Sequence, residues 1–90
     1  MIDVLLVDDH ALVRSGLSLL MESADDVQVV GEAADGPRAV ELVQSLEPDV
    51  VLMDLSMPGM DGVEATREVL RVRPDSVVVV LTSFSDQPRV

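Results

Sequence analysis

The 90-residue sequence contains no cysteine, no tryptophan and no tyrosine, and Phe84 is its single aromatic residue. The absence of cysteine excludes disulfides, thiolate metal sites and thiol catalysis, and it suits a reducing compartment. Flavin binding is also disfavoured, because neither tryptophan nor tyrosine is available to stack on the ring. Valine, leucine and alanine must therefore build the core of a single small domain.

Lysine is absent as well, so all six basic residues are arginines, and 17 acidic residues bring the net charge to −11. A surface of this charge repels phosphate backbones and anionic lipids, which argues against direct nucleic-acid contact and membrane binding by this segment. The sequence has no basic leader and no apolar run near the ~20 residues that span a bilayer. We expect a soluble cytoplasmic protein.

Short apolar runs alternate with helical patterns along the whole chain. The runs predict strands at 2–7, 27–33, 50–53 and 77–81. Between them, apolar residues three and four apart predict helices. The faces expected to be buried are Leu12, Val13, Gly16, Leu17, Leu20 and Met21, then Ala39, Leu42, Val43 and Leu46, then Val63, Thr66, Val69 and Leu70. This alternation predicts an α/β fold with a doubly wound parallel sheet.

Polar residues follow the predicted strands at the edge where open α/β sheets bind ligands. They are Asp8 and Asp9 after the first strand, Asp54 after the third and Thr82 after the fourth. If the first and third strands are neighbours, three carboxylates converge and repel one another unless a cation lies among them. Carboxylates without imidazole or thiolate suit Mg²⁺, and Asp54 could then act as a nucleophile that forms an acyl phosphate.

Each of these residues also has a purely structural interpretation. A single aspartate after a strand is often a helix cap or a solvated loop residue, and Thr82 could be a turn residue. His10 is interpreted as a residue of the first helical turn. Two other metal-dependent functions fail on residue identity. An aspartate-nucleophile phosphatase needs an acid where Ser56 stands, and a calcium loop needs a glutamate where Ala65 stands.

Three segments carry a resemblance to a known family. They are LLVDDH at 5–10, DLSMPGMDG at 54–62 and LTS at 81–83. Together they resemble the receiver domain of bacterial two-component response regulators over the whole chain. The pieces VRSGL at 13–17 and VGEAADG at 30–36 resemble the NarL/FixJ group. The resemblance implies a flavodoxin-like (CheY-like) sheet with strand order 2-1-3-4.

The resemblance also implies roles for individual residues. Asp54 would receive a phosphoryl group from a histidine kinase or from a small donor such as acetyl phosphate. Asp8, Asp9, Asp54 and the backbone carbonyl of Ser56 would hold Mg²⁺, and Thr82 would contact the phosphoryl group. Members of the group usually carry a C-terminal helix-turn-helix domain that binds DNA and regulates transcription. The domain itself would be a regulatory phosphoacceptor rather than an enzyme.

The sequence departs from the family pattern at its end. Receiver domains complete the site with a lysine after a fifth strand, so residues 1–90 are expected to be a receiver domain that lacks its fifth strand and last helices. We expect weak phosphorylation or none by these residues alone. We also expect bare apolar surface and a valine-rich edge at 77–80 to favour a homodimer, exchange of elements or stabilisation by a neighbour. A phosphorylation-independent interaction module of receiver shape is the alternative function.

Overall fold

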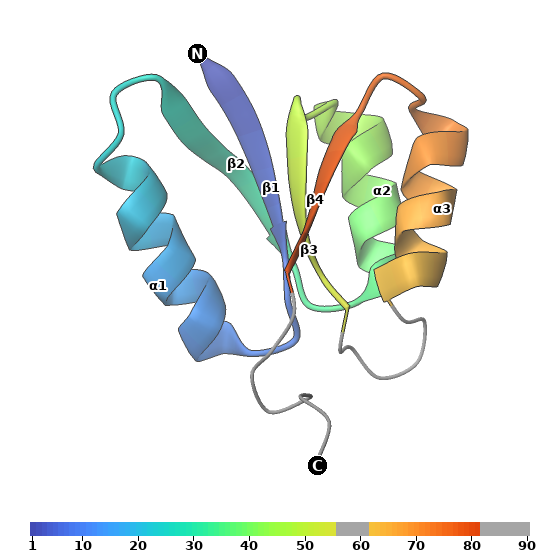
Figure 1. Cartoon of the computed structure of the whole chain (residues 1–90), viewed down its shortest axis with the longest axis horizontal. Helices are drawn as coiled ribbons and strands as arrows, with labels where there is room; N and C mark the ends of the chain where they lie inside the picture. Colours follow the sequence, from blue (N-terminus) through green and yellow to red (C-terminus); the bar gives the residue numbers. More distant parts are fainter. Residues whose placement is uncertain (56–61, 82–90) are drawn as a thin grey trace, which may run out of the picture.

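A computed structural model describes residues 1–55 and 62–81 of the chain. Within these ranges it contains a parallel four-stranded sheet and three helices (Figure 1). The strands are β1 (Ile2–Val7), β2 (Val27–Ala33), β3 (Val50–Asp54) and β4 (Val77–Leu81), and the helices are α1 (Ala11–Glu22), α2 (Gly36–Leu46) and α3 (Gly62–Val72). The strand order is β2-β1-β3-β4, so the predicted fold class and order are confirmed.

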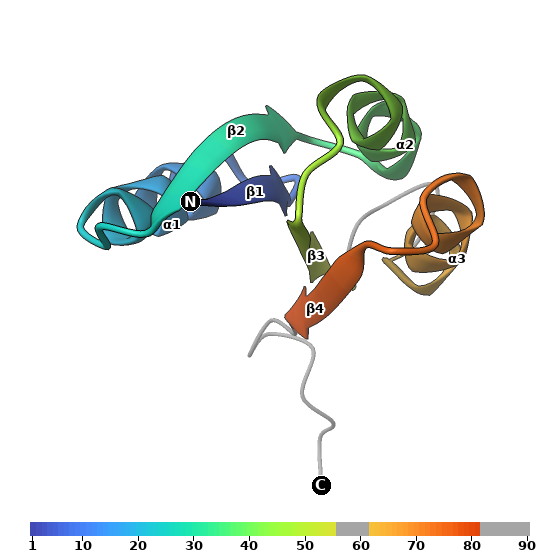
Figure 2. The ribbon, with the colours of Figure 1, turned by 90° about the horizontal axis from the view of Figure 1, so that it is seen from above.

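The helices cover both faces of the sheet. Figures 1 and 2 show α1 on one face and α2 beside α3 on the other. The main hydrophobic core lies under α2 and α3 and comprises Leu5, Val7, Ala33, Ala39, Val43, Val51, Met53, Ala65 and Val69. Val4 and Leu6 are also buried, although they alternate with these residues along β1. The central strand is therefore apolar on both faces, as a buried parallel strand must be.

Helix α2 shows how local sequence sets the ends of these elements. The Asp35 side chain caps its start by accepting a hydrogen bond from the Arg38 backbone N–H at 2.8 Å, and Pro37 occupies the first turn. The helix ends at Leu46, and its C-cap residue Glu47 adopts the left-handed conformation with φ of 51°. Pro48 follows and is fully buried. The predicted proline stop is thus confirmed, and β3 begins two residues later.

The predicted buried faces of all three helices were partly wrong. In α2 Ala39 and Val43 are buried, but Leu46 is 38% exposed. In α3 the buried residues are Gly62, Ala65 and Val69, whereas Val63 is 57% exposed. In α1 Leu12 is 86% exposed, and all twelve residues, which lie within the described range, are at least partly exposed. Periodicity identifies a helix, but the rotation of that helix depends on which residues are small enough to approach the sheet. No helix in residues 1–55 or 62–81 is long and apolar enough to cross a membrane.

Candidate functional site

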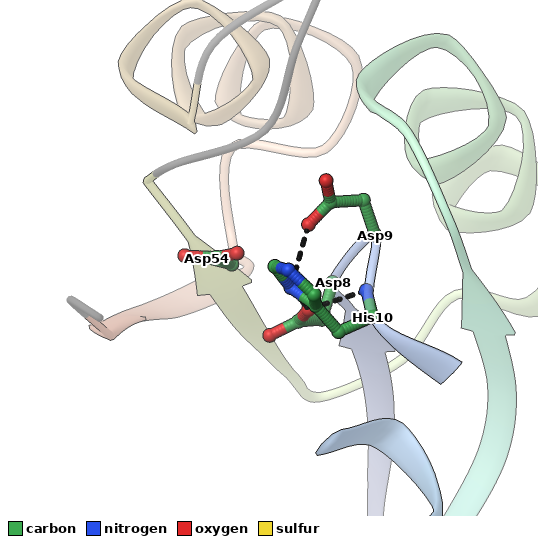
Figure 3. Close-up of side chains that lie close together, drawn as sticks. All are labelled: Asp8, Asp9, His10 and Asp54. Atoms are coloured by element: carbon green, nitrogen blue, oxygen red, sulfur yellow. Dashed lines mark hydrogen bonds and ion pairs between the residues drawn. The ribbon is translucent and has the colours of Figure 1, made fainter. Parts of the chain in front are cut away.

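Asp8 and Asp54 lie next to each other at the carboxyl edge of the sheet. Val7 at the end of β1 pairs with Met53 in β3, so the residue after each one continues the same register. Both aspartates are buried, with 6% exposure for Asp8 and 4% for Asp54. Ligand oxygens of these two residues, one oxygen of Asp9 and a ring nitrogen of His10 all lie within 4.8 Å of one another (Figure 3). The predicted convergence of the three carboxylates is confirmed.

Asp8, in the segment that connects β1 to α1, is held by hydrogen bonds to both its backbone and its side chain. The Asp8 N–H donates to the Ala33 carbonyl at 3.0 Å, which continues the pairing of β1 with β2. Its Oδ1 accepts from the His10 backbone N–H at 2.7 Å and lies 3.1 Å from His10 Nδ1. Its carbonyl oxygen accepts from Arg14 Nη1 at 2.5 Å. These bonds fix the orientation of Asp8, so it is not a solvated loop residue.

Asp9 supplies the observation that tests whether a metal ion fits this site. Its Oδ1 is buried and has no hydrogen-bond partner among the described residues, although His10 Nδ1 lies 3.0 Å away. A buried carboxylate oxygen without a hydrogen bond carries a desolvation penalty that a cation would relieve. Three carboxylates are hard oxygen donors that suit Mg²⁺. The three carboxylates therefore fit a hard divalent cation. The imidazole of His10, which the sequence argument did not expect at the site, lies against Asp8 and Asp9.

His10 is a member of the cluster that the sequence interpretation missed. It is the N-cap residue of α1 rather than a residue of its first turn, and its side chain is 62% exposed. The hydrogen bond to Asp8 and then the negative charge of Asp9 raise the pKa of His10 above its ordinary value, while desolvation acts in the opposite direction. The position of His10 directly after two acidic residues could have indicated its place in the cluster, because a short turn brings its ring next to both carboxylates.

The start of α3 lies directly against the backbone that carries Asp54. A Cβ atom on Gly62 would lie 2.5 Å from the Asp54 carbonyl oxygen and 2.5 Å from Leu55 Cα. Only glycine allows this approach, and it brings the Gly62 N–H within 3.4 Å of the Leu55 carbonyl oxygen. The predicted site residues Ser56 and Thr82 lie outside the described residues.

The sheet order and the acidic edge together define a class of protein. It is a doubly wound α/β domain with a buried aspartate cluster at the carboxyl ends of β1 and β3. Comparison with known families makes the assignment specific, because residues 4–90 match the response regulator receiver domain. The chain belongs to this family, and the resemblance inferred from its motifs is confirmed.

Relatives within the family place the chain among regulators of the NarL type. It is 52% identical over 90 residues to the transcriptional regulatory protein LiaR of Bacillus subtilis, covering 100% of this chain and 43% of LiaR. It therefore spans less than half the length of that relative. Among solved structures it resembles the signal receiver domain of the putative response regulator NarL from Mycobacterium tuberculosis, with 38% identity and a TM-score of 0.84 over 97% of this chain and 69% of that one.

A second solved structure supports the fold over the whole chain. The response regulator domain of CheB from Thermotoga maritima has a TM-score of 0.88 and 37% identity, covering 100% of this chain and 66% of that one. These similarities indicate a regulatory role.

Proposed function

We propose that this chain is the phosphoacceptor receiver domain of a two-component response regulator and that Asp54 accepts the phosphoryl group. The single observation that carries the proposal is the convergence of Asp8, Asp9 and Asp54, with Asp54 buried at the end of β3. Membership of the receiver domain family supports it independently. Residues 1–90 would form the receiver portion of a longer regulator.

In the proposed reaction a carboxylate oxygen of Asp54 attacks the phosphorus atom of the donor. The P–N bond of a phosphohistidine, or the P–O bond of acetyl phosphate, breaks as the new P–O bond forms. The released histidine nitrogen takes up a proton, whereas acetate leaves as the anion. Asp8 and Asp9 would bind Mg²⁺ together with Asp54 and the Ser56 carbonyl. When bound, Mg²⁺ would supply charge neutralisation and Lewis-acid polarisation of the phosphoryl oxygens.

The surrounding chain supports this role for Asp54 in two ways. The hydrogen bonds of Asp8 to Ala33, His10 and Arg14 hold its carboxylate beside Asp54. The reaction therefore does not have to supply the entropy cost of ordering the Asp8 carboxylate. Burial of Asp54 restricts water around the acyl phosphate. We assign the contact to the transferred phosphoryl group to the hydroxyl of Thr82, on the basis of the family resemblance.

The remaining parts of the signalling pathway are proposed from the relatives. The donor would be a histidine kinase or a small phosphodonor in the cytoplasm. A helix-turn-helix domain in the full-length protein would bind DNA, because LiaR is a transcriptional regulatory protein and extends well beyond the matched region. The net charge of −11 argues that the segment 1–90 itself makes no contact with nucleic acid.

Intact mass spectrometry tests the assignment of Asp54. The full-length product of the gene and the 90-residue chain are incubated in parallel with acetyl phosphate and MgCl₂. We expect the full-length protein to gain about 80 Da, one phosphoryl group, and we expect EDTA to prevent the gain. We expect slower modification of the 90-residue chain, because it contains no lysine to contact the developing phosphoryl charge.

Two substitutions identify the modified residue. Asp54→Asn should abolish the mass gain, whereas Asp75→Asn should leave it unchanged, because Asp75 is exposed in the turn that precedes β4. An unchanged mass of the unsubstituted full-length protein would refute the phosphoacceptor role. That result would favour the phosphorylation-independent interaction module.

A further inference from the structure

Arg14 connects the segment that carries Asp8 and Asp9 to β2, the edge strand of the sheet. It lies on α1, and its guanidinium donates in two directions. Nη1 donates to the Asp8 carbonyl oxygen at 2.5 Å, and Nε donates to Glu32 Oε1 at 3.1 Å. The planar guanidinium fork can satisfy two separated acceptors with one fixed geometry. Arg14 therefore ties the end of β1 to the end of β2.

The environment of Arg14 differs from that of Arg38 and Arg71. Its side chain is 18% exposed, whereas Arg38 and Arg71 are 58% and 66% exposed and pair with glutamates one turn away on their own helices. Exposed pairs of the second kind contribute little. The bond of Arg14 to the Asp8 carbonyl is partly buried, whereas the bond to Glu32 lies nearer to solvent, with Glu32 42% exposed. Together the two bonds join two strands to a helix, so they constrain the backbone.

A break in strand register puts Glu32 within reach of Arg14. β1 and β2 pair as Val4 with Val29, but then as Leu5 with Gly31, so Val30 is an extra residue in β2. After the bulge Leu6 pairs with Glu32. Paired residues share a face of the sheet, so Glu32 lies with Leu6 on the α1 side, opposite the core face that holds Val7.

An unbroken register would have the opposite result. It would pair Glu32 with Val7 and turn the glutamate toward the core under α2 and α3, because a shift of one residue exchanges the faces of a strand. The bulge thus supplies Arg14 with its second acceptor while keeping Ala33 in the core.

We propose that Arg14, anchored by Glu32, is a positioning residue that sets the affinity of the Asp8, Asp9 and Asp54 cluster for Mg²⁺. The inference rests on the proposed function. The carbonyl of Asp8 belongs to the peptide plane between Asp8 and Asp9, so the bond from Arg14 fixes the direction in which both side chains leave the backbone. Without that bond, repulsion among the carboxylates would spread them apart, and binding would have to reassemble them.

Metal titration of the 90-residue chain tests this role directly. The dissociation constants of Mg²⁺ and of Mn²⁺ are measured by calorimetry, with free Mn²⁺ followed by electron paramagnetic resonance. Arg14→Gln should raise both constants about tenfold or more, as loss of an outer-shell partner does elsewhere. Glu32→Gln should raise them less, because the bond from Arg14 to Asp8 remains. Arg38→Gln is the matched control and should change neither constant.

A second measurement separates positioning from a merely structural role. Urea unfolding in EDTA gives the folded fraction of each variant, and the dissociation constants are corrected for it. Arg14→Lys keeps the charge and the aliphatic stem but not the fork, so it should remain folded and still bind Mg²⁺ several-fold more weakly. If the corrected constants of Arg14→Gln and Arg14→Lys fall within twofold of the unsubstituted chain, the inference is overturned.

Phosphorylation kinetics provide a further discriminating readout. In the full-length protein Arg14→Gln should raise the Mg²⁺ concentration at half-maximal rate while leaving the rate at saturating Mg²⁺ nearly unchanged. Failure of the proposed function would look different, because no variant would gain the phosphoryl mass although metal titration still ranked the variants as expected. Absence of Mg²⁺ binding by the unsubstituted chain at millimolar concentration would overturn the inference itself.

Discussion

At the scale of single residues, the acidic cluster includes one side chain that becomes positive when it is protonated, His10. His10 Nδ1 lies 3.0 Å from an Asp9 oxygen and 3.1 Å from an Asp8 oxygen, on the exposed side of the site. Protonated His10 would offset part of the repulsion among the carboxylates when no cation is bound. Its charge should therefore influence the stability of the metal-free protein.

The pH dependence of unfolding tests this contribution of His10. Its pKa in the folded protein is raised above the ordinary value of 6.5 by the bond to Asp8 and the charge of Asp9. The stabilisation is therefore fully present below about pH 6.5 and is lost as the pH rises through the folded-state pKa. In EDTA, the free energy of unfolding measured with urea should fall from pH 6 upward by more in the unsubstituted chain than in His10→Asn.

His10 is the only histidine in the sequence, which makes the comparison direct. Asparagine is a good N-cap residue and keeps the backbone N–H that donates to Asp8, so the substitution removes the titrating ring and leaves the turn intact. Equal pH slopes in the two proteins would contradict the assignment.

At the scale of elements, the site depends on how closely α3 approaches β3. The Gly62 backbone contacts the Asp54 carbonyl and Leu55, and an added Cβ would meet backbone atoms that cannot rotate away. We expect Gly62→Ala to displace the start of α3 and to lower the free energy of unfolding by about 1–3 kcal/mol, as overpacking does elsewhere. Urea unfolding monitored by far-ultraviolet circular dichroism measures the change.

Gly16 provides the matched control for this substitution. It lies inside α1, and a Cβ atom there would meet no atom of other elements within 4 Å in residues 1–55 and 62–81. Gly16→Ala should therefore raise the free energy of unfolding by about 0.5–1 kcal/mol, because alanine favours the helix and narrows the unfolded ensemble. Destabilisation of both variants to the same degree would show that tight packing at Gly62 is not the cause.

At the scale of the whole molecule, repulsion between negative charges opposes folding. The net charge is −11 over 90 residues, and three carboxylates lie together at one edge of the sheet. Any added salt should stabilise the chain by screening this repulsion. MgCl₂ should raise the free energy of unfolding more than NaCl at equal ionic strength, since bound metal adds about 2.7 kcal/mol at a hundredfold excess over its dissociation constant.

The specific part of this effect should depend on Asp9, whose buried oxygen has no hydrogen-bond partner among the described residues. Asp9→Asn should respond equally to the two salts in thermal unfolding, whereas Asp75→Asn should keep the larger response to MgCl₂. If MgCl₂ stabilised Asp9→Asn over NaCl as much as it stabilised the unsubstituted chain, Asp9 would not be a metal ligand.

Exposed apolar side chains on α1 and β4 agree with the bare surface expected from the sequence. They include Leu12, Leu19 and Leu20 on the helix and Val77, Val79 and Val80 on the strand. The homodimer or element exchange inferred from such a surface stays a prediction, as do the roles of Ser56 and Thr82.

Local signals in the amino-acid sequence were enough to predict the order of strands and helices, the ends of α2 and β3, and the three carboxylates of the site. Apolar runs, capping residues and prolines act within a few residues of where they stand, so they can be interpreted without knowledge of the packing. Parallel strands connected by helices bring the residue after each strand to the same edge of the sheet. The proximity of Asp8 and Asp54 follows once β1 and β3 are neighbours.

The buried face of α3 and the pairing of Arg14 with Glu32 were set by packing between segments distant in sequence. The start of α3 lies in close contact with the Asp54 backbone through Gly62, and the position of Glu32 follows from the bulge at Val30. No local pattern encodes either contact. Arg14 looks like an ordinary residue near the start of a helix until that packing sets it beside Glu32, whereas His10 reaches the aspartates through a local turn.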